Sequence, residues 1–196
     1  MLEALIAQCA YNTHPDTVRA IIQVESAGNP YAIGVNFGGS NNKRPTNAAE
    51  AGQIARKLIA KGKNIDMGLM QINSASMRRF GLSPEAMFDP CTNIRVGTKI
   101  LSINYSQAVE IYGPGENALR AALSAYNTGN MVKGFHNGYV AKYYKGGNIA
   151  KLSKTQQAAI ETANVSLSAP PTENFKEILI EVLNPFTSET SVYSRK

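Results

Sequence analysis

The sequence lacks any run that approaches the roughly 18 consecutive apolar residues of a membrane-spanning helix, so we expect no membrane span. It also lacks a basic segment at its start. Residues 1–10 carry no lysine or arginine and are too short for a secretory leader, so we expect a leader to be absent or already removed. Charged residues make up only 17% of the chain against 43% hydrophobic residues, which excludes a disordered chain and predicts a folded core.

Cysteine is scarce as well. Cys9 and Cys91 match neither the spacing of a zinc site nor that of a redox motif, so we expect no metal centre and no cofactor. Two interpretations of the pair stay open on spacing alone: two buried free thiols in a reducing compartment, or one bridge in an oxidising compartment. On the loop-entropy model, such a bridge would stabilise the fold by roughly 4.5 kcal/mol.

The charge is unbalanced in one direction, with a formal net charge of +6. The excess lies before residue 165, because residues 165–196 carry three basic and four acidic side chains. A basic body favours a polyanionic partner, either nucleic acid or an acidic envelope polymer. Its cations are spread along the chain, apart from Lys43–Arg44 and Lys61 with Lys63, which is typical of a solubilising surface. We expect no nucleic-acid partner.

Apolar spacing and helix-capping residues predict a mainly helical body over residues 1–164. We expect helices over residues 2–10, 15–28, 46–60, 91–112, 117–127 and 138–145. A strand at 32–35 runs into a glycine-rich turn and could return as a hairpin through 43–45. Residues 83–85 predict a turn or a short helix.

Residues 165–196 form a different kind of segment. Residues 165–171 have the composition of a linker, and an amphipathic helix that ends at Pro185 follows them. Its apolar face comprises Phe175, Ile178, Leu179 and Val182. Such a helix could pack on the body or dock a partner, and we expect a removable, partner-facing tail.

Glu25 interrupts an otherwise apolar helical stripe. Val18, Ile21 and Ile22 share one face of the expected helix, and the next position on that face is Glu25. Burial disfavours the charged form of a carboxyl group, so a glutamate here could donate a proton near neutral pH. The alternative is a glutamate at the edge of the stripe that bends out to water.

Three segments combine small residues with side chains that form hydrogen bonds: residues 24–26, 68–73 and 125–129. Gly68 would permit close backbone approach to a ligand. Gln71 and Asn73 offer amide donors and acceptors that suit sugar hydroxyls and N-acetyl groups. Each segment alone also has an ordinary explanation, as a turn, a surface residue or a buried ring.

Together and in this order, the Glu-Ser, Gly-Leu-Met-Gln and Ala-Tyr-Asn motifs of these segments closely resemble those of lytic transglycosylases with a goose-lysozyme-like fold. Residues 29–33 and 88–94 resemble the branch found with type IV secretion and conjugation systems. The resemblance covers residues 8–145. It implies a predominantly helical α+β, lysozyme-like fold with a small β element on one side of a glycan cleft. The catalytic domain would span residues 1–164 and the tail residues 165–196.

The resemblance implies a periplasmic enzyme that opens peptidoglycan locally for such an apparatus, with the tail as a contact for its subunits. Glu25 would be the sole catalytic carboxylate. It would protonate the β-1,4 bond between N-acetylmuramic acid and N-acetylglucosamine, then act as base on the 6-hydroxyl of the muramic acid. The product would be a 1,6-anhydro sugar, formed without water.

The resemblance also implies roles for residues around Glu25. Ser26 would contact sugar or hold Glu25 in place, Tyr126 would hydrogen-bond Glu25, and Asn127 would shape the local turn. Tyr143 or Tyr144 would supply a tyrosine from the following helix. The residues expected to line the cleft are Gly68, Leu69, Met70, Gln71 and Asn73. A bridge between Cys9 and Cys91 is implied too, and the long segment from Ile33 to Asn64 could form one wall of the cleft.

Two other functions compete with this one. A hydrolytic, lysozyme-type muramidase would need a second carboxylate, about 5–5.5 Å away for retention or about 6.5–9.5 Å away for inversion. Asp66 is the one candidate, although a turn or capping role is common for aspartate before a glycine. Asp16 lies more than about two helical turns from Glu25. A non-catalytic glycan-binding scaffold subunit is the third possibility, and the intact Glu25 argues against it.

Overall fold

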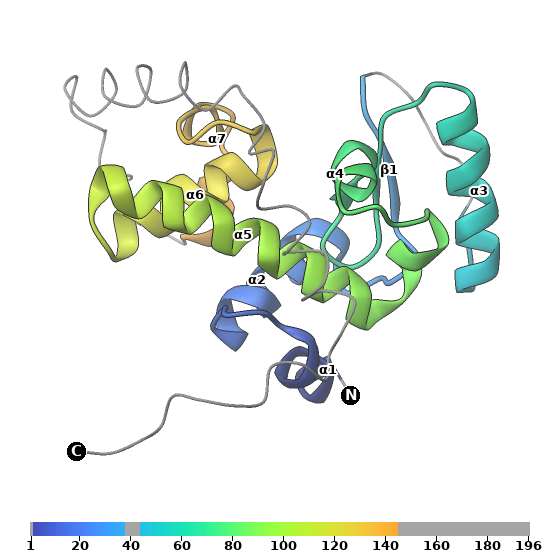
Figure 1. The fold of residues 1–196 in the computed structure, drawn as a ribbon, viewed down its shortest axis with the longest axis horizontal. Helices are drawn as coiled ribbons and strands as arrows, with labels where there is room; N and C mark the ends of the chain where they lie inside the picture. Colours follow the sequence, from blue (N-terminus) through green and yellow to red (C-terminus); the bar gives the residue numbers. More distant parts are fainter. Residues whose placement is uncertain (1, 38–43, 145–196) are drawn as a thin grey trace.

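The computed structural model describes residues 2–37 and 44–144, which form a helical body with one small sheet (Figure 1). The helices are α1 (Leu2–Cys9), α2 (Pro15–Ser26), α3 (Ala48–Ala60), α4 (Ser74–Arg79), α5 (Pro90–Tyr112), α6 (Glu116–Thr128) and α7 (Lys133–His136), with the 3-10 helices η1 (Glu85–Phe88) and η2 (Val140–Tyr143). The strands β1 (Ile33–Val35), β2 (Ile65–Met67) and β3 (Ile72–Asn73) pair antiparallel in that order. The predicted α+β class, predominantly helical, is confirmed.

The long helices begin within two residues of their predicted starts, and side-chain caps fix two of these starts. Asn47 accepts a hydrogen bond from the amide of Glu50 (2.9 Å) at the start of α3. Asp89 accepts from the amide of Thr92 (2.8 Å) at the start of α5. Helix α2 has Pro15 in its first turn, and it ends at Ala27 in the left-handed conformation (φ 51°). These ends fix the length of α2 and so place Glu25 in its last turn.

Strand β1 does not return through residues 43–45. It pairs instead with β2, with Ile33 opposite Met67, and the amide of Asn36 donates to the carbonyl of Asn64 (3.0 Å) beyond the strand. Helix α3 lies between the two strands in sequence, so the pairing is longer in range than a local hairpin. Residues 38–43, where the glycine-rich turn was expected, lie outside the described residues.

The last predicted helix is also different. Residues 138–145 were expected to be helical, but the described part holds only the short η2, and α7 precedes it without having been predicted. Gly138, at φ +77°, separates the two and changes the direction of the chain. This change of direction matters because it sets the position of Tyr139, described below.

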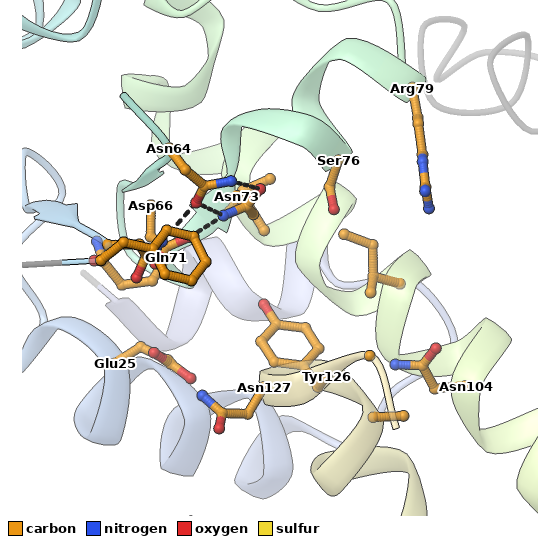
Figure 2. Close-up of a pocket in the computed structure, with 16 residues that line it drawn as sticks. Glu25, Asn64, Asp66, Gln71, Asn73, Ser76, Arg79, Asn104, Tyr126 and Asn127 are labelled. Atoms are coloured by element: carbon orange, nitrogen blue, oxygen red, sulfur yellow. Dashed lines mark hydrogen bonds between the residues drawn. The ribbon is translucent and has the colours of Figure 1, made fainter. Parts of the chain in front are cut away.

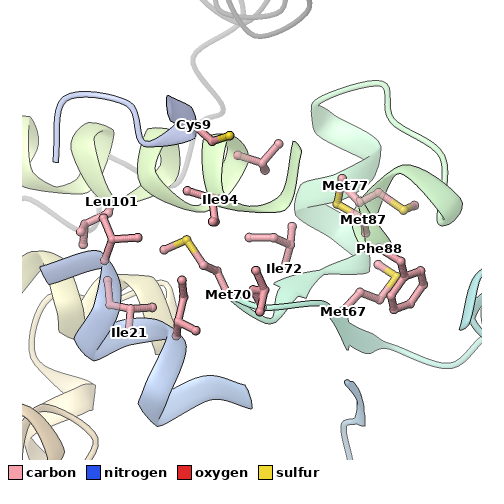
Figure 3. Packing of buried hydrophobic residues seen from close by; sticks show 14 of the residues in the cluster. Cys9, Ile21, Met67, Met70, Ile72, Met77, Met87, Phe88, Ile94 and Leu101 are labelled. Carbon is pink, nitrogen blue, oxygen red and sulfur yellow. The ribbon is translucent and has the colours of Figure 1, made fainter. Parts of the chain in front are cut away.

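Helix α5 crosses the centre of the body, with α6 and α7 along one end and the sheet, α3 and α4 near the other (Figure 1). The main core fills the space between α5, α2 and the sheet (Figure 3). Fully buried members include Ile21, Met70 and Ile94, each contributing about 1.5–3 kcal/mol of burial free energy. Met70 and Ile21 thus join the glycine-containing turn to the helix that carries Glu25.

Cys9 and Cys91 are joined by a disulfide, as the resemblance implied. The bridge links the end of α1 to the first turn of α5, 82 residues further along. The predicted boundary at residue 164 and the amphipathic tail lie outside the described residues. Within 2–37 and 44–144, no helix combines the length and apolar character needed to cross a membrane.

Candidate active site

A cleft of about 510 Å³ opens between the end of α2, the sheet, α4, α5 and α6 (Figure 2). It brings together side chains from all three segments that the sequence singled out: Glu25, Gln71, Asn73, Tyr126 and Asn127. The sheet supplies one side, as expected, through Asp66 of β2 and Asn73 of β3. The lining is mostly polar, with amide groups as the commonest feature, which suits a carbohydrate more than an apolar ligand.

Glu25 lies at the inner end of α2 and faces this cleft. Burial raises the pKa of Glu25 above its usual value, and the negative charge of Asp66 adds to the rise. A hydrogen bond from Tyr139 and the positive charge of Lys142 oppose it without cancelling it. Glu25 is half-buried and faces the cleft rather than bending out to open water, which is the outcome that the apolar stripe favoured. The group can hold a proton at a higher pH than an ordinary glutamate.

Tyr139, not Tyr126, holds Glu25. The hydroxyl of Tyr139 donates to Oε1 of Glu25, and the hydroxyl of Tyr143 donates to that of Tyr139 (2.7 Å). Burial and the charge of Glu25 raise the pKa of Tyr139, so its hydroxyl keeps the proton that it donates. The four-residue spacing of Tyr139 and Tyr143 could have indicated this pair. Tyr144 packs under Arg120 instead, with 4.3 Å from the guanidinium to the ring centroid.

Tyr126 has a different partner from the one predicted. Its hydroxyl donates to the backbone carbonyl of Met70 (2.8 Å), so it anchors the turn between β2 and β3 rather than the carboxylate. The ring still lines the cleft. The resemblance assigned Tyr126 to the carboxylate, whereas the buried carbonyl of Met70 also needs a donor and receives this one.

Gly68 is required by the protein itself and not by a ligand. A Cβ at this position would lie 2.2 Å from Nδ2 of Asn93 and 2.4 Å from the carbonyl of Met87, and φ is +77°. The prediction that Leu69 and Met70 line the cleft is also wrong, since both are buried in the core. The tight turn points them inward and leaves Gln71, at φ +48°, facing the cleft.

Ser26 and Asn127 position the walls of the cleft. The hydroxyl of Ser26 bonds the carbonyl of Leu69 (2.7 Å), which ties the end of α2 to the β2–β3 turn. It does not contact the carboxylate of Glu25 directly. Oδ1 of Asn127 accepts from Nδ2 of Asn137 (3.1 Å), so it joins α6 to the segment after α7 while lining the cleft.

Asp66 is neither a turn nor a cap residue. It lies within β2, and its two carboxylate oxygens accept hydrogen bonds from Asn73 (2.7 Å) and Asn36 (2.8 Å). It faces the same cleft as Glu25 (Figure 2). The cleft thus contains two carboxyl groups: one held by a tyrosine and shielded, the other fixed by two amides. Among the described residues, no group of three or more acidic, His or Cys side chains could hold a metal ion.

Replacing Tyr139 with Phe should lower kcat about tenfold and leave KM nearly unchanged, because the hydrogen bond to Glu25 is lost while the rest of the cleft is unaltered. The bond from Tyr139 lowers the pKa of Glu25. Its loss therefore raises that pKa further, and the pH at which activity falls on the alkaline side should move upward. A pH profile of cleavage measures both effects.

The matched control is Tyr126→Phe. It removes a hydroxyl from the same cleft but breaks the bond to Met70 instead. We expect Tyr126→Phe to melt at a lower temperature than the wild type. The alkaline side of its pH–activity profile should stay where it is in the wild type. If the alkaline side of the pH–activity profile moved in Tyr126→Phe but not in Tyr139→Phe, Tyr126 would be the residue that holds Glu25, as first predicted.

The chain is similar to several known proteins. The family model described as the transglycosylase SLT domain matches residues 4–147. The chain is 44% identical over 132 residues to type IV secretion system protein virB1 of Brucella suis, covering 67% of this chain and 55% of that protein. It is 38% identical over 135 residues to protein virB1 of Agrobacterium fabrum, covering 69% and 54%, and 34% identical over 133 residues to invasion protein IagB of Salmonella typhimurium, covering 66% and 63%.

The chain spans about half the length of the virB1 relatives. No solved structure is significantly similar to it. The matched range, residues 4–147, covers most of the chain, and Glu25, the β2–β3 turn, Tyr126 and Tyr139 all lie within it. The chain belongs to the transglycosylase SLT domain family.

Proposed function

We propose that the chain is a peptidoglycan lytic transglycosylase that cleaves the β-1,4 bond between N-acetylmuramic acid and N-acetylglucosamine and forms 1,6-anhydromuramic acid. The observation that carries the proposal is Glu25, a carboxyl group with a raised pKa at the inner end of an amide-lined cleft. Membership of the transglycosylase SLT family supports the same reaction.

The reaction needs two proton transfers, both made through Glu25. Protonated Glu25 gives its proton to the bridging oxygen, and the bond from that oxygen to C1 of the muramic acid breaks. The Glu25 carboxylate then takes the proton of the 6-hydroxyl, whose oxygen bonds to C1. Tyr139 fixes the carboxyl group through both steps, since its hydroxyl donates to Oε1. The negative charge of Asp66 favours the positive charge that builds at C1.

A hydrolytic muramidase is the second candidate, and a specific observation favours it. Asp66 faces the cleft of Glu25, so the second carboxylate that hydrolysis requires is available. Mass spectrometry of the muropeptides released from purified cell wall separates the two reactions. We expect ends lighter by one water than reducing ends. Reducing ends alone would mean that Asp66 serves a hydrolase.

The setting is proposed from the relatives. Two are named as virB1 proteins, one of them a type IV secretion system protein, and we infer that this chain opens the wall for such an apparatus or for conjugation. The Cys9–Cys91 bridge supports an oxidising compartment such as the periplasm.

Residues 165–196 would contact subunits of the apparatus. Limited proteolysis at 165–171 should leave an active body, and loss of folding on truncation would refute a separate tail.

A further inference from the structure

The cleft carries charges of opposite sign at its two ends. Glu25 and Asp66 lie towards one end, whereas Arg79, in the last turn of α4, lies at the other (Figure 2). Within the part of the chain that the structure describes, Arg79 is the one cationic side chain that lines the cleft. The reaction proposed above uses the acidic end and leaves the function of Arg79 open.

Polar side chains at the two ends differ in how they are satisfied. At the acidic end, Nδ2 of Asn73 donates to Asn64 and to Asp66, each at 2.7 Å. At the other end, the side chains of Arg79, Ser76 and Asn104 make no hydrogen bond or ion pair with any described residue. These side chains therefore have donors that a ligand in the cleft could engage. Such a ligand would supply the partners that polar groups normally have once they are buried.

Three other arginines, Arg19, Arg56 and Arg120, form ion pairs, whereas Arg78, like Arg79, forms none with a described carboxylate. Arg19 binds Glu3 and Asp16, and Arg56 binds Glu85. Arg79 has no such carboxylate, although its guanidinium is a planar fork that matches a carboxylate with two parallel hydrogen bonds. Its position in a cleft, beside a hydroxyl and an amide, is suited to an anion that arrives with the substrate.

We propose that Arg79, with Ser76 and Asn104, forms a subsite for a carboxylate carried by the muramic acid residues of the glycan. The inference rests on the proposed function, because it assumes a peptidoglycan strand in the cleft. The sugars of such a strand are neutral. Its negative charge lies on the carboxylates of the stem peptides or, where stems have been removed, on the exposed lactyl carboxylate. The subsite selects charged strands over neutral N-acetyl glycans.

If Arg79 only stabilised the end of α4, Arg78 would share that role. Both arginines lie in the last turn of α4, where a cation interacts favourably with the helix dipole. Both are exposed, but only Arg79 lines the cleft. Arg78→Gln is therefore a matched control, since it removes the same charge from the same helix end.

The test measures binding rather than cleavage, so that it does not depend on the lytic reaction. The Glu25→Gln protein, with and without Arg79→Gln or Arg78→Gln, is titrated with three soluble glycan strands. One strand keeps its stem peptides, one has had them removed by an amidase, and one has its stem carboxylates converted to amides. We expect Arg79→Gln to weaken binding of the intact strand about tenfold, less at high salt, and Arg78→Gln to leave it unchanged.

The three strands identify the carboxylate. An Arg79 effect confined to the intact strand assigns the stem peptide, and an effect that persists on the stripped strand assigns the lactyl group. An equal effect of both arginine variants, an undiminished Arg79 effect on the amidated strand, or no binding by Glu25→Gln to any strand would overturn the subsite. Failure of the wild-type protein to cleave wall would instead refute the proposed function while leaving the binding result readable.

Discussion

Glu25→Gln should lower the rate of wall cleavage about a thousandfold, because the amide can neither give a proton to the bridging oxygen nor take one from the 6-hydroxyl. The substitution keeps the size of the side chain and can still accept the hydrogen bond from Tyr139. Binding of the glycan should therefore persist. Release of soluble muropeptides from purified cell wall measures the rate, and a sedimentation assay measures binding.

The stability of this variant gives an independent control. Because the pKa of Glu25 is raised in the folded protein, ionisation of Glu25 costs stability as pH rises through that pKa. At pH 7, Glu25→Gln should thus melt at or above the wild-type temperature, and its advantage should shrink as pH falls below about 4.5. Cleavage at a normal rate by a well-folded variant would show that Glu25 is not catalytic.

Asn93→Leu should destabilise the fold by about 4 kcal/mol. Asn93 is completely buried, and its side chain makes three hydrogen bonds of 2.8 Å to backbone groups. It accepts from the amide of Met70 and donates to the carbonyls of Met67 and Met87. Leucine would leave all three groups buried without partners. Urea unfolding followed by circular dichroism measures the change.

Thr92→Ala is the matched control for Asn93. Thr92 precedes it in the same first turn of α5, and its hydroxyl makes no hydrogen bond with a described residue. We expect a change within about 0.5 kcal/mol. An unfolding free energy of Asn93→Leu within about 1 kcal/mol of the wild type would mean that α5 does not support the β2–β3 turn as described.

Local patterns predicted α1, α2, α3, α5 and α6 and singled out the main acid, but they missed the short helices α4 and α7. Pro15 marks the start of α2 correctly, and α5 begins at Pro90, one residue before its predicted start, because the ends of helices depend mainly on neighbouring backbone groups. Glu25 was identifiable because it takes the position of an apolar residue on a regular stripe. The helical period singled out that position but left a side chain at the edge of the stripe as an alternative, and the three motifs together favoured the catalytic interpretation.

The partners of these residues were not predictable in the same way. Tyr126 and Tyr139 are both aromatic residues near a helix end, and only the reversal of the chain at Gly138 decides which one meets Glu25. Asp66 resembled a turn residue because its strand is only three residues long. Gly68 was correctly singled out for a close approach, but the sequence does not say whether a ligand or Asn93 makes it.

The most direct measurement is the titration of the Glu25 side-chain carboxyl by carbon-13 NMR. Glu3 provides an internal reference, since its hydrogen bonds with Arg19 lower its pKa. A single shielded acid that carries a proton to the glycosidic oxygen requires Glu25 to titrate above the ordinary glutamate value of 4.5, and well above Glu3. Titration of Glu25 at or below that of Glu3 would contradict this, because the group would then be ionised whenever the substrate needed its proton.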